Sequence, residues 1–446
     1  MNSKTLFINT SPVKLFFIAV IPGSIGMLAS ALYQLIDGIF VGQILGATPF
    51  AALNLAMPFV IINFSLADLI GVGSSVPISI NLGQKNNKEA NNIFTCACIM
   101  IILSGILIGA LLYGAAPILM KIMGAQGEFA ALATQYLRVY ALCSPLTTIV
   151  FAVDNYLRIC GKINSSMFLN ILMASISAVL EFVFLYIFKW GIWGAAFATC
   201  IGMIICALIA FVPFFRGNML LHFCRPRFSF SLTKKIIVCG MPNFLNNSAA
   251  RIVSVIMNML LVRFGGETAV SVYGVLMYVE GFMQSVLYGM CDSLQPSVGY
   301  NWGAGKYSRV RAIEKCCFTA SFIVSALAML VIFVFPEQIT HIFVTGDDLE
   351  LLKMSVYALK IFSLTYAVRW LSFAAQSYML AISKSAYASV ISLSTALIFP
   401  LFFILILQKL ELTGIWLNMP LTSLLAGILS IFIIFKTKDE LTQKDL

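Results

Sequence analysis

Residues 15 to 42 read LFFIAVIPGSIGMLASALYQLIDGIFVG, an apolar run whose single charged side chain is Asp37. About twenty apolar residues in a helix are enough to cross a lipid bilayer. A carboxyl group at bilayer depth is costly, so it usually faces a protein cavity and marks a functional site. The run therefore predicts a transmembrane helix in which Asp37 belongs to a site for protons, ions or charged ligands.

The rest of the chain repeats this apolar pattern. Its 446 residues are 60% hydrophobic and 10% charged, and the mean hydropathy of +0.96 excludes an ordinary soluble domain. We expect an all-α polytopic membrane protein with about twelve transmembrane helices. Their predicted limits are 15–42, 51–82, 93–120, 132–157, 165–188, 191–214, 236–264, 269–302, 315–336, 353–382, 385–407 and 412–435.

The distribution of positive charge predicts the orientation in the membrane. The net charge is +10, but Lys and Arg gather in alternate connections between the apolar runs, so we expect no nucleic-acid partner. By the positive-inside rule, both termini lie in the cytoplasm. The first apolar run has no small-residue cleavage site after a short core, and we expect it to remain in the mature protein.

Cysteine usage predicts neither disulfides nor a metal site. The eleven cysteines lie mostly inside the apolar runs, without a CxxC pair. In apolar helices, cysteine usually acts as a small packing residue.

A charged stretch near the midpoint divides the chain. It runs from Arg216 to Lys235 and reads as a cytoplasmic linker over residues 216–235. We therefore expect an N-terminal six-helix lobe over residues 1–215 and a C-terminal six-helix lobe over residues 236–446.

The two halves also resemble each other in sequence. A shift of 220 residues aligns Pro22 with Pro242, Gly46 with Gly266, and Asn81-Leu82-Gly83 with Asn301-Trp302-Gly303. Because six helices is an even number, the repeats run parallel and form two pseudo-symmetric bundles. Such repeats are typical of secondary transporters that rock about a central site.

The chain resembles the MATE (multidrug and toxic compound extrusion) family over nearly its whole length, most closely the multidrug-exporting, MepA-like branch. The resemblance rests on these residues: Pro22, Leu35-Ile36-Asp37-Gly38, Val41-Gly42, Leu45-Gly46, Ala51-Ala52, Gly71-Val72-Gly73, Leu82-Gly83, Gly240-Met241-Pro242, Tyr273-Gly274, Gln295-Pro296 and Tyr300-Asn301-Trp302-Gly303-Ala304.

The resemblance implies secondary active efflux of lipophilic organic cations through alternating access, in a bacterial cytoplasmic membrane. The expected partners are small amphipathic cationic drugs or toxins and the surrounding lipids. We expect no enzyme activity, a functional monomer and no cofactor, because an ion gradient drives export.

Three polar residues are predicted to lie at similar depth in the outer half of the membrane. Chain direction places Asp37, Glu181 and Thr199 there. By resemblance, Asp37 and Glu181 correspond to acids of the family's cavity and Thr199 to a hydroxyl residue of the same cavity. Ser177 stands one turn before Glu181, where the family often has Asn.

Four further residues are candidates near this site. Tyr33 and Gln34 precede Asp37 by four and three residues and so share its helical face. Asn155, in Asn155-Tyr156-Leu157-Arg158, resembles a motif of the family's fourth helix. Pro22 removes one backbone hydrogen bond and favours a kink in the first helix, whose bending the family links to the protonation of its acid.

Desolvation suggests the coupling mechanism. A carboxyl group removed from water favours its neutral form, so it can bind and release a proton. Competition between a proton and a lipophilic cation for Asp37, aided by Glu181, would couple proton entry to drug export.

The C-terminal half differs where it corresponds to this site. When the two repeats are aligned, Met257 corresponds to Asp37. The candidate site residues in that lobe are Asn247 and Glu280. Arg251, Lys360 and Arg369 add positive charge. Since a sodium site needs hard oxygen ligands and negative charge, we favour protons over sodium as the coupling ion, with sodium antiport as the alternative.

The remaining intramembrane charges have simpler explanations. Asp154 and Arg158 are spaced for an i,i+4 ion pair. Asp292 approaches the end of its helix, where Lys306 or Arg309 could reach it.

Glycines at positions 38, 42 and 46 predict a ridge for close helix packing.

Two other classes of function remain as alternatives. A lipid-linked saccharide flippase of the wider superfamily often has two more helices and a strongly cationic centre. An intramembrane enzyme or receptor is disfavoured because the chain has two histidines, His222 and His341, and no hydrolase, protease or nucleotide-binding motif.

Overall fold

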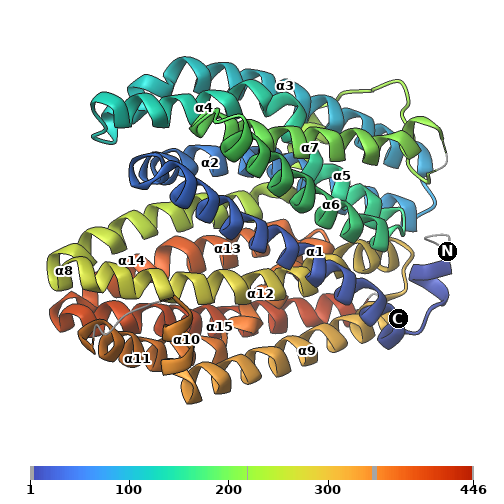
Figure 1. Cartoon of the computed structure of the whole chain (residues 1–446). Helices are drawn as coiled ribbons and strands as arrows, with labels where there is room; N and C mark the ends of the chain where they lie inside the picture. Colours follow the sequence, from blue (N-terminus) through green and yellow to red (C-terminus); the bar gives the residue numbers. More distant parts are fainter. Residues whose placement is uncertain (1–4, 218, 344–348, 444–446) are drawn as a thin grey trace.

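The described residues form two helical bundles that lie side by side. The computed structural model describes residues 5–217, 219–343 and 349–443, and all regular secondary structure in these ranges is helical. Figure 1 shows the first half of the chain, in blue and green, above the second half, in yellow to red. Both ends of the chain lie at the same end of the bundles, which we call the terminal end; the opposite end is the distal end.

The first bundle contains the six predicted membrane passes. It begins with a short π-helical turn, Thr5–Asn9. The six passes are α1 (Pro12–Phe40) extended to Leu45, α2 (Ala47–Gly83), α3 (Asn87–Ile122), α4 (Gly127–Thr147) with α5 (Ile149–Ile159), α6 (Ile163–Phe182) extended to Ile187, and α7 (Ile192–Phe215).

The second bundle begins with a long element that contains two passes. The chain in α8 (Phe230–Gly303) leaves helical geometry at Gly266, where φ is 61° and ψ is −152°. The remaining elements are α9 (Tyr307–Val334), α10 (Pro336–Phe343), α11 (Leu349–Ser363), α12 (Arg369–Ala381), α13 (Ser385–Leu393), α14 (Phe399–Leu407) and α15 (Glu411–Gln443). The sequence did not predict the short helix α10.

The described helices account for twelve passes. They form ten continuous spans that are long and apolar enough to cross a membrane, or eleven if α11 and α12, bent by 40°, count as one further span. One of these spans, Ser385–Thr437, has 53 residues and would be about 80 Å long as a single helix. It turns back before Glu411, whose φ is 49°, and Asn418 Nδ2 donates to the Pro400 carbonyl at 2.9 Å. This span therefore contains two passes.

The connection between the bundles is shorter than predicted and is attached to α3. Helix α8 begins at Phe230, inside the stretch expected to be linker. The Asn91 side chain accepts a hydrogen bond from the His222 backbone amide at 3.0 Å. Asn92 accepts one from the Arg227 amide at 2.8 Å. The connection is thus held against the first bundle.

Corresponding residues of the two sequence repeats adopt corresponding structures. Gly46 and Gly266 both have positive φ, 95° and 61°, at the turn between the first two passes of each half. Glycine adopts this conformation without a steric penalty. Asn81 donates to the carbonyl four residues earlier at 2.8 Å, and Asn301 does the same at 2.8 Å.

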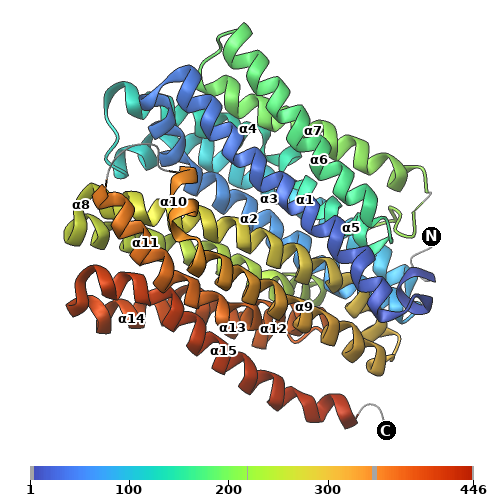
Figure 2. The same ribbon diagram turned by 60° about the horizontal axis from the view of Figure 1, so that its bottom comes forward.

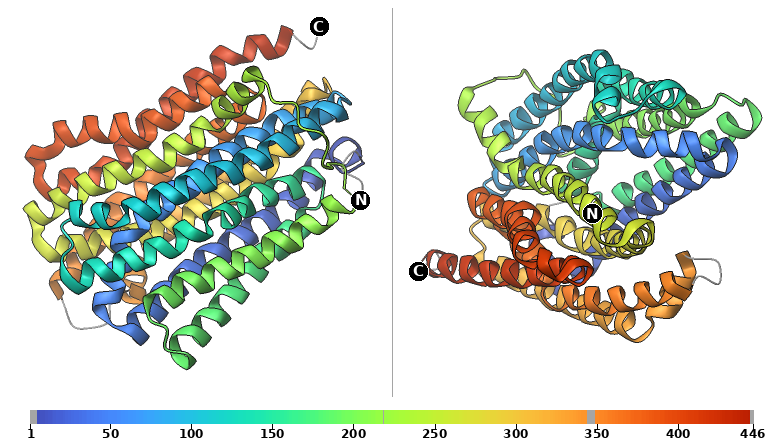
Figure 3. Two further views of the ribbon diagram at one scale, coloured as in Figure 1. Left: turned by 90° about the horizontal axis from the view of Figure 1, so that it is seen from above. Right: turned by 90° about the vertical axis from the view of Figure 1, so that its left-hand side faces the viewer.

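The bundles share one hydrophobic core near the terminal end and have separate cores near the distal end. The shared core combines residues from both halves, among them Ile78, Phe94, Val298 and Met379. The distal core of the first bundle includes Tyr136, whereas the distal core of the second is built from other residues. Figures 2 and 3 show the two bundles as distinct groups of helices.

Backbone contacts join the bundles in the half near the terminal end. A Cβ added at Gly240 of α8 would lie 1.7 Å from the carbonyl oxygen of Leu69 in α2. One added at Gly23 of α1 would lie 1.7 Å from Ser293 Oγ of α8. Because any side chain at these glycines would collide, the helices approach each other at backbone distance.

Candidate transport site

A buried polar cluster lies in the distal half of the first bundle. Asp37 and Tyr33 come from α1, Glu181 from α6 and Thr199 from α7. Asp37 is 5% exposed and Glu181 0% exposed. The Tyr33 hydroxyl lies 2.5 Å from Thr199 Oγ1 and donates to Glu181 Oε2 at 3.4 Å. The structure therefore brings together four residues that the sequence had singled out.

The two acids of this cluster are electrostatic neighbours. The carboxyl groups of Asp37 and Glu181 interact with each other. Asp37 Oδ1 and Glu181 Oε1 are buried without hydrogen-bond partners among the described residues. Two adjacent carboxylates in a dry site repel each other, and an unpaired buried acceptor is costly. A shared proton or a bound cation would relieve both penalties.

Two tyrosines that the sequence analysis missed complete the cluster. Tyr136 and Tyr140 of α4 are buried, with ring centroids 5.2 Å apart, and both interact electrostatically with Asp37. Tyr136 also donates to Met57 Sδ at 3.8 Å. Their i,i+4 spacing was the available signal, since it places both rings on one face of the predicted helix.

Three other candidates lie elsewhere. Ser177 is buried where α6 meets α7, and a Cβ added at Gly202 would lie 2.1 Å from Ser177 Oγ. The Gln34 side chain is exposed, so it does not join the buried cluster. Asn155 donates to the carbonyl of Phe151 in its own helix at 3.2 Å and makes no described contact with the cluster.

Pro22 lies where the two bundles meet. Helix α1 continues through it from Pro12 to Phe40, and the neighbouring Gly23 lies against Ser293 of α8. The hinge at Pro22 stays a prediction.

The predicted glycine ridge after Asp37 was wrong. A Cβ added at Gly38 or Gly42 would meet only the Phe50 ring, at 3.5 and 3.7 Å, which is ordinary contact. Gly46 forms the turn into α2 instead. These glycines therefore do not bring two helix backbones together.

The possible site in the second bundle contains an internal ion pair. Glu280 is paired with Arg369, and the Tyr366 hydroxyl donates to Glu280 Oε2 at 2.7 Å. Arg369 also lies over the Phe373 ring, 5.2 Å from its centroid. Glu280 is therefore neutralised by the protein itself. Asn247 is half-buried in the first pass of α8.

The predicted ion pair between Asp154 and Arg158 is confirmed, at 2.6 Å. Arg158 is only 1% exposed, so the pair is buried. Ser166 donates to Asp154 Oδ1 at 2.5 Å, and Arg158 Nη1 donates to Ser293 Oγ of the other bundle at 3.5 Å. This network crosses the interface between the bundles.

The predicted partners of Asp292 were wrong. Its Oδ1 accepts from Gln295 Nε2 at 2.7 Å and from Ser377 Oγ at 3.3 Å. Arg309 instead donates to the carbonyl of Phe7 at 2.9 Å. The π-helical turn Thr5–Asn9 supplies the acceptor for this arginine, which sequence spacing could not reveal.

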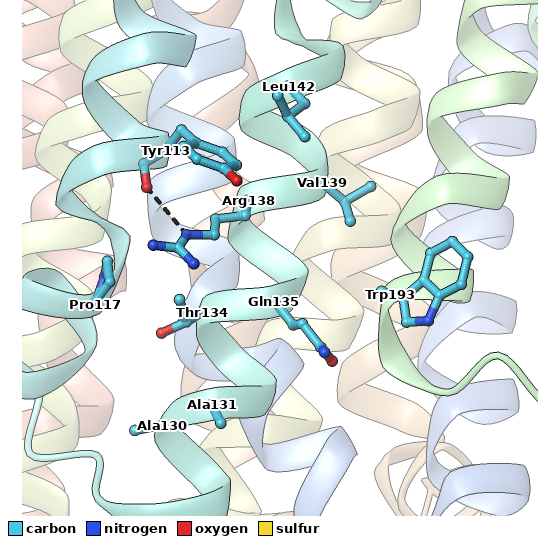
Figure 4. Close-up of a pocket in the computed structure, with 10 residues that line it drawn as sticks. All are labelled: Tyr113, Pro117, Ala130, Ala131, Thr134, Gln135, Arg138, Val139, Leu142 and Trp193. Carbon is cyan, nitrogen blue, oxygen red and sulfur yellow. Dashed lines mark hydrogen bonds between the residues drawn. The ribbon is translucent and has the colours of Figure 1, made fainter.

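A groove on the outside of the first bundle is separate from the buried cluster. It has a volume of about 740 Å³ and is lined by α3, α4 and Trp193. Figure 4 shows Arg138 in this groove, where Nε donates to the Tyr113 carbonyl at 3.3 Å. Because α4 directs Tyr136 and Tyr140 inward, the groove lies on the opposite face of that helix. Among the described residues no group of three metal-ligating side chains occurs.

Twelve passes in two repeated bundles, with buried charges between and within them, define an integral membrane transporter. The chain belongs to the MatE family, whose model matches residues 22–187 and again residues 242–406. The two matches begin 220 residues apart (242 − 22), which is the shift of the internal repeat. The protein is thus a transporter and not an enzyme.

Individual relatives are distant in sequence but align with nearly the whole chain. The multidrug export protein MepA of Staphylococcus aureus strain MSSA476 is 23% identical over 427 residues, covering 95% of this chain and 93% of the relative. The protein of the same name from Staphylococcus saprophyticus is 23% identical over 431 residues, with the same coverage. A crystal structure of MATE in complex with MaL6 superposes with a TM-score of 0.94 at 22% identity, covering 99% of this chain and 100% of that one.

Proposed function

We propose that this protein exports lipophilic organic cations from a bacterial cell in exchange for protons. The observation that carries the proposal is the buried neighbourhood of Asp37 and Glu181, with Tyr33 and Thr199 bound beside them. The multidrug export proteins of Staphylococcus, to which the chain is similar, support the substrate class and a bacterial cytoplasmic membrane. A single chain acts as the transporter.

The two carboxyl groups act as a switch between a proton and a cation. When both are ionised, their repulsion in a dry site favours uptake of one positive charge. A proton and a cationic substrate compete for the two carboxylates, so binding of one releases the other. The Tyr33 hydroxyl holds the Glu181 carboxyl group in position, and Thr199 in turn contacts that hydroxyl.

The arrangement of the bundles supports alternating access. The positive-inside rule assigns the terminal end, with both chain termini, to the cytoplasm. The bundles share a core at that end and have separate cores at the distal end. Transport then requires the contacts at the terminal end to open while the distal parts close, so that the site faces each side in turn.

The alternative coupling ion, sodium, has less support. A sodium site in the second bundle would need Glu280, but Arg369 is its ion-pair partner and Tyr366 its hydrogen-bond donor. A cation at Glu280 would have to displace the guanidinium. The unpaired carboxyl oxygens in the first bundle favour a site there instead.

The decisive experiment compares the parent with Asp37→Asn in proteoliposomes under an imposed pH gradient. Asparagine keeps the shape of the side chain but cannot exchange a proton, so gradient-driven transport of a fluorescent lipophilic cation should fall at least tenfold, roughly the scale of one charged hydrogen bond. Glu128→Gln, which alters an exposed carboxyl group at the start of α4, should leave transport unchanged.

Two results would overturn the proposal. The first is transport by Asp37→Asn at the parent's rate under the same gradient. The second is transport by the parent that follows a sodium gradient and ignores the pH gradient. A lipid-linked saccharide flippase would move neither dye nor protons in this assay.

A further inference from the structure

Arg251 lies in the middle of a membrane pass and is not buried within either bundle. It belongs to the first pass of α8, Phe230–Gly266, and its side chain is exposed. The ion pairs of the described residues involve other arginines, Arg158 and Arg369. An arginine at this depth is costly in lipid, so it normally faces water or an anionic partner.

The helix geometry gives the direction in which Arg251 points. Gly240 precedes it by eleven residues, which is about three turns of an α-helix, so the two residues share one side of α8. Gly240 lies against the Leu69 carbonyl of α2 in the first bundle. Arg251 therefore faces the first bundle, distal to the point where the bundles touch. Asn247 and Asn258 lie on the same side, one and two turns away from it.

A neighbouring side of this helix is exposed and apolar. Ile252 and Met259, seven residues apart, are 54% and 68% exposed. At 100° per residue they lie about a quarter turn from Arg251. Val255 and Val262, which are 55% and 62% exposed, lie about 40° and 20° from Arg251. The side of α8 that carries Arg251 therefore combines polar residues with exposed apolar ones, as suits a surface that contacts an amphipathic molecule.

Helix α1 of the first bundle lies opposite the side of α8 that carries Arg251. Gly23 lies against Ser293 of α8, and Gln34, eleven residues later, shares its side and is exposed. Gln34 therefore faces the second bundle in the distal half, where the two bundles have separate cores. Asp37 follows Gln34 by three residues on the interior side of α1. The acids Asp37 and Glu181 thus lie within the first bundle, and Arg251 lies on the side of the second bundle that faces it.

We propose that Arg251, with Asn247 and Asn258, forms a subsite that binds an anionic group of the transported molecule, such as a carboxylate or sulfonate. The planar guanidinium offers paired donors that match a carboxylate, and the flanking amides supply further hydrogen bonds. This subsite rests on the proposed export function and extends it. A substrate with an amine and an acid engages Asp37 and Glu181 with one end and Arg251 with the other.

The test uses two dyes that differ only in the anionic group. Rhodamine B carries a cationic xanthene and a free carboxylate, and its methyl ester carries only the cation. Both are measured with the same proteoliposomes, so their ratio does not depend on the active fraction of the protein. Arg251→Gln should raise the KM for rhodamine B roughly tenfold or more and leave the KM for the ester unchanged. Arg251→Lys should retain part of the discrimination.

The matched control is Arg263→Gln. Arg263 lies on the same helix near its distal end, over the Phe264 ring at 5.7 Å. Its replacement should change the KM of neither dye. Equilibrium binding of both dyes to the purified parent and to Arg251→Gln in detergent provides a second measurement that does not require transport.

Three outcomes would overturn the subsite. One is an unchanged ratio of the two dyes in Arg251→Gln, and another is an equal change for both. The third is a dependence of ester transport on chloride, relative to gluconate, that disappears in Arg251→Gln, since Arg251 would then bind a free inorganic anion. If the parent transports neither dye, the proposed export function is refuted. The binding measurement still decides whether Arg251 recognises the carboxylate.

Discussion

Gly83 of α2 and Gly303 of α8 are equivalent residues of the internal repeat, and each lies against the other's helix. A Cβ added at Gly83 would lie 2.1 Å from the carbonyl oxygen of Tyr300. One added at Gly303 would lie 2.1 Å from the carbonyl oxygen of Ile80. The two helices therefore meet across the pseudo-two-fold axis at backbone distance. This reciprocal contact closes the terminal end between the bundles.

The first prediction concerns this contact. Gly83→Ala should separate α2 from α8 and increase the population that is open at the terminal end, because the added methyl group would collide with a backbone oxygen. Spin labels at the exposed positions Lys85 and Lys306 should report a longer distance by double electron–electron resonance. Gly281→Ala is the control, since nothing lies within 4 Å of a Cβ there. An unchanged distance distribution in Gly83→Ala would refute the role of this contact in closure.

Much of the fold could be predicted from the sequence because its signals are local. Hydropathy predicted the passes, and the alignment of Gly46 with Gly266 predicted a structural repeat, although the turns that these two glycines form were not predicted because Gly46 was assigned to a packing ridge. The depth of Asp37, Glu181 and Thr199 followed from chain direction alone.

The partners of buried charges could not be predicted in the same way. Glu280 pairs with Arg369, which is far away in the sequence, and local spacing carries no information about such a contact. The prediction for Asp292 was wrong because it assigned Arg309 by nearness to the helix end, whereas the structure pairs Asp292 with Gln295, one turn away on the same helix, and with the distant Ser377. The Asp154–Arg158 pair could be predicted because its two residues are four apart on one helix.

The second prediction concerns that pair. Arg158→Met leaves Asp154 buried without its cation and should lower the free energy of unfolding by about 3–5 kcal/mol. The double variant Asp154→Leu with Arg158→Met should be less destabilised than Arg158→Met, because no unpaired charge remains. Thermal unfolding of the purified variants in detergent measures both effects. Arg225→Met, in the exposed connection, should have no effect, and strictly additive losses in the double variant would contradict the coupling.

The third prediction concerns the coupling ion. Because Arg369 already neutralises Glu280, sodium should not stabilise the parent relative to choline at equal ionic strength. Thermal unfolding midpoints measured over a series of sodium concentrations check this directly. A midpoint that rises and saturates with sodium would show a specific site. If Glu280→Gln abolished that rise, the site would include Glu280 and the proposed proton coupling would have to be reconsidered.

The fourth prediction concerns the hydroxyl contact between Tyr33 and Thr199, at 2.5 Å. Tyr33→Phe keeps the ring but leaves the Thr199 hydroxyl without this partner, so the free energy of unfolding should fall by about 1–3 kcal/mol. Thr199→Val in the Tyr33→Phe background should cost less than Thr199→Val alone, because the shared hydrogen bond is already lost. Proton-driven dye transport should fall as well, since Glu181 also loses the Tyr33 donor. Tyr186→Phe, which alters an exposed ring, is the control. Equal costs of Thr199→Val in the two backgrounds would show that Tyr33 and Thr199 act independently.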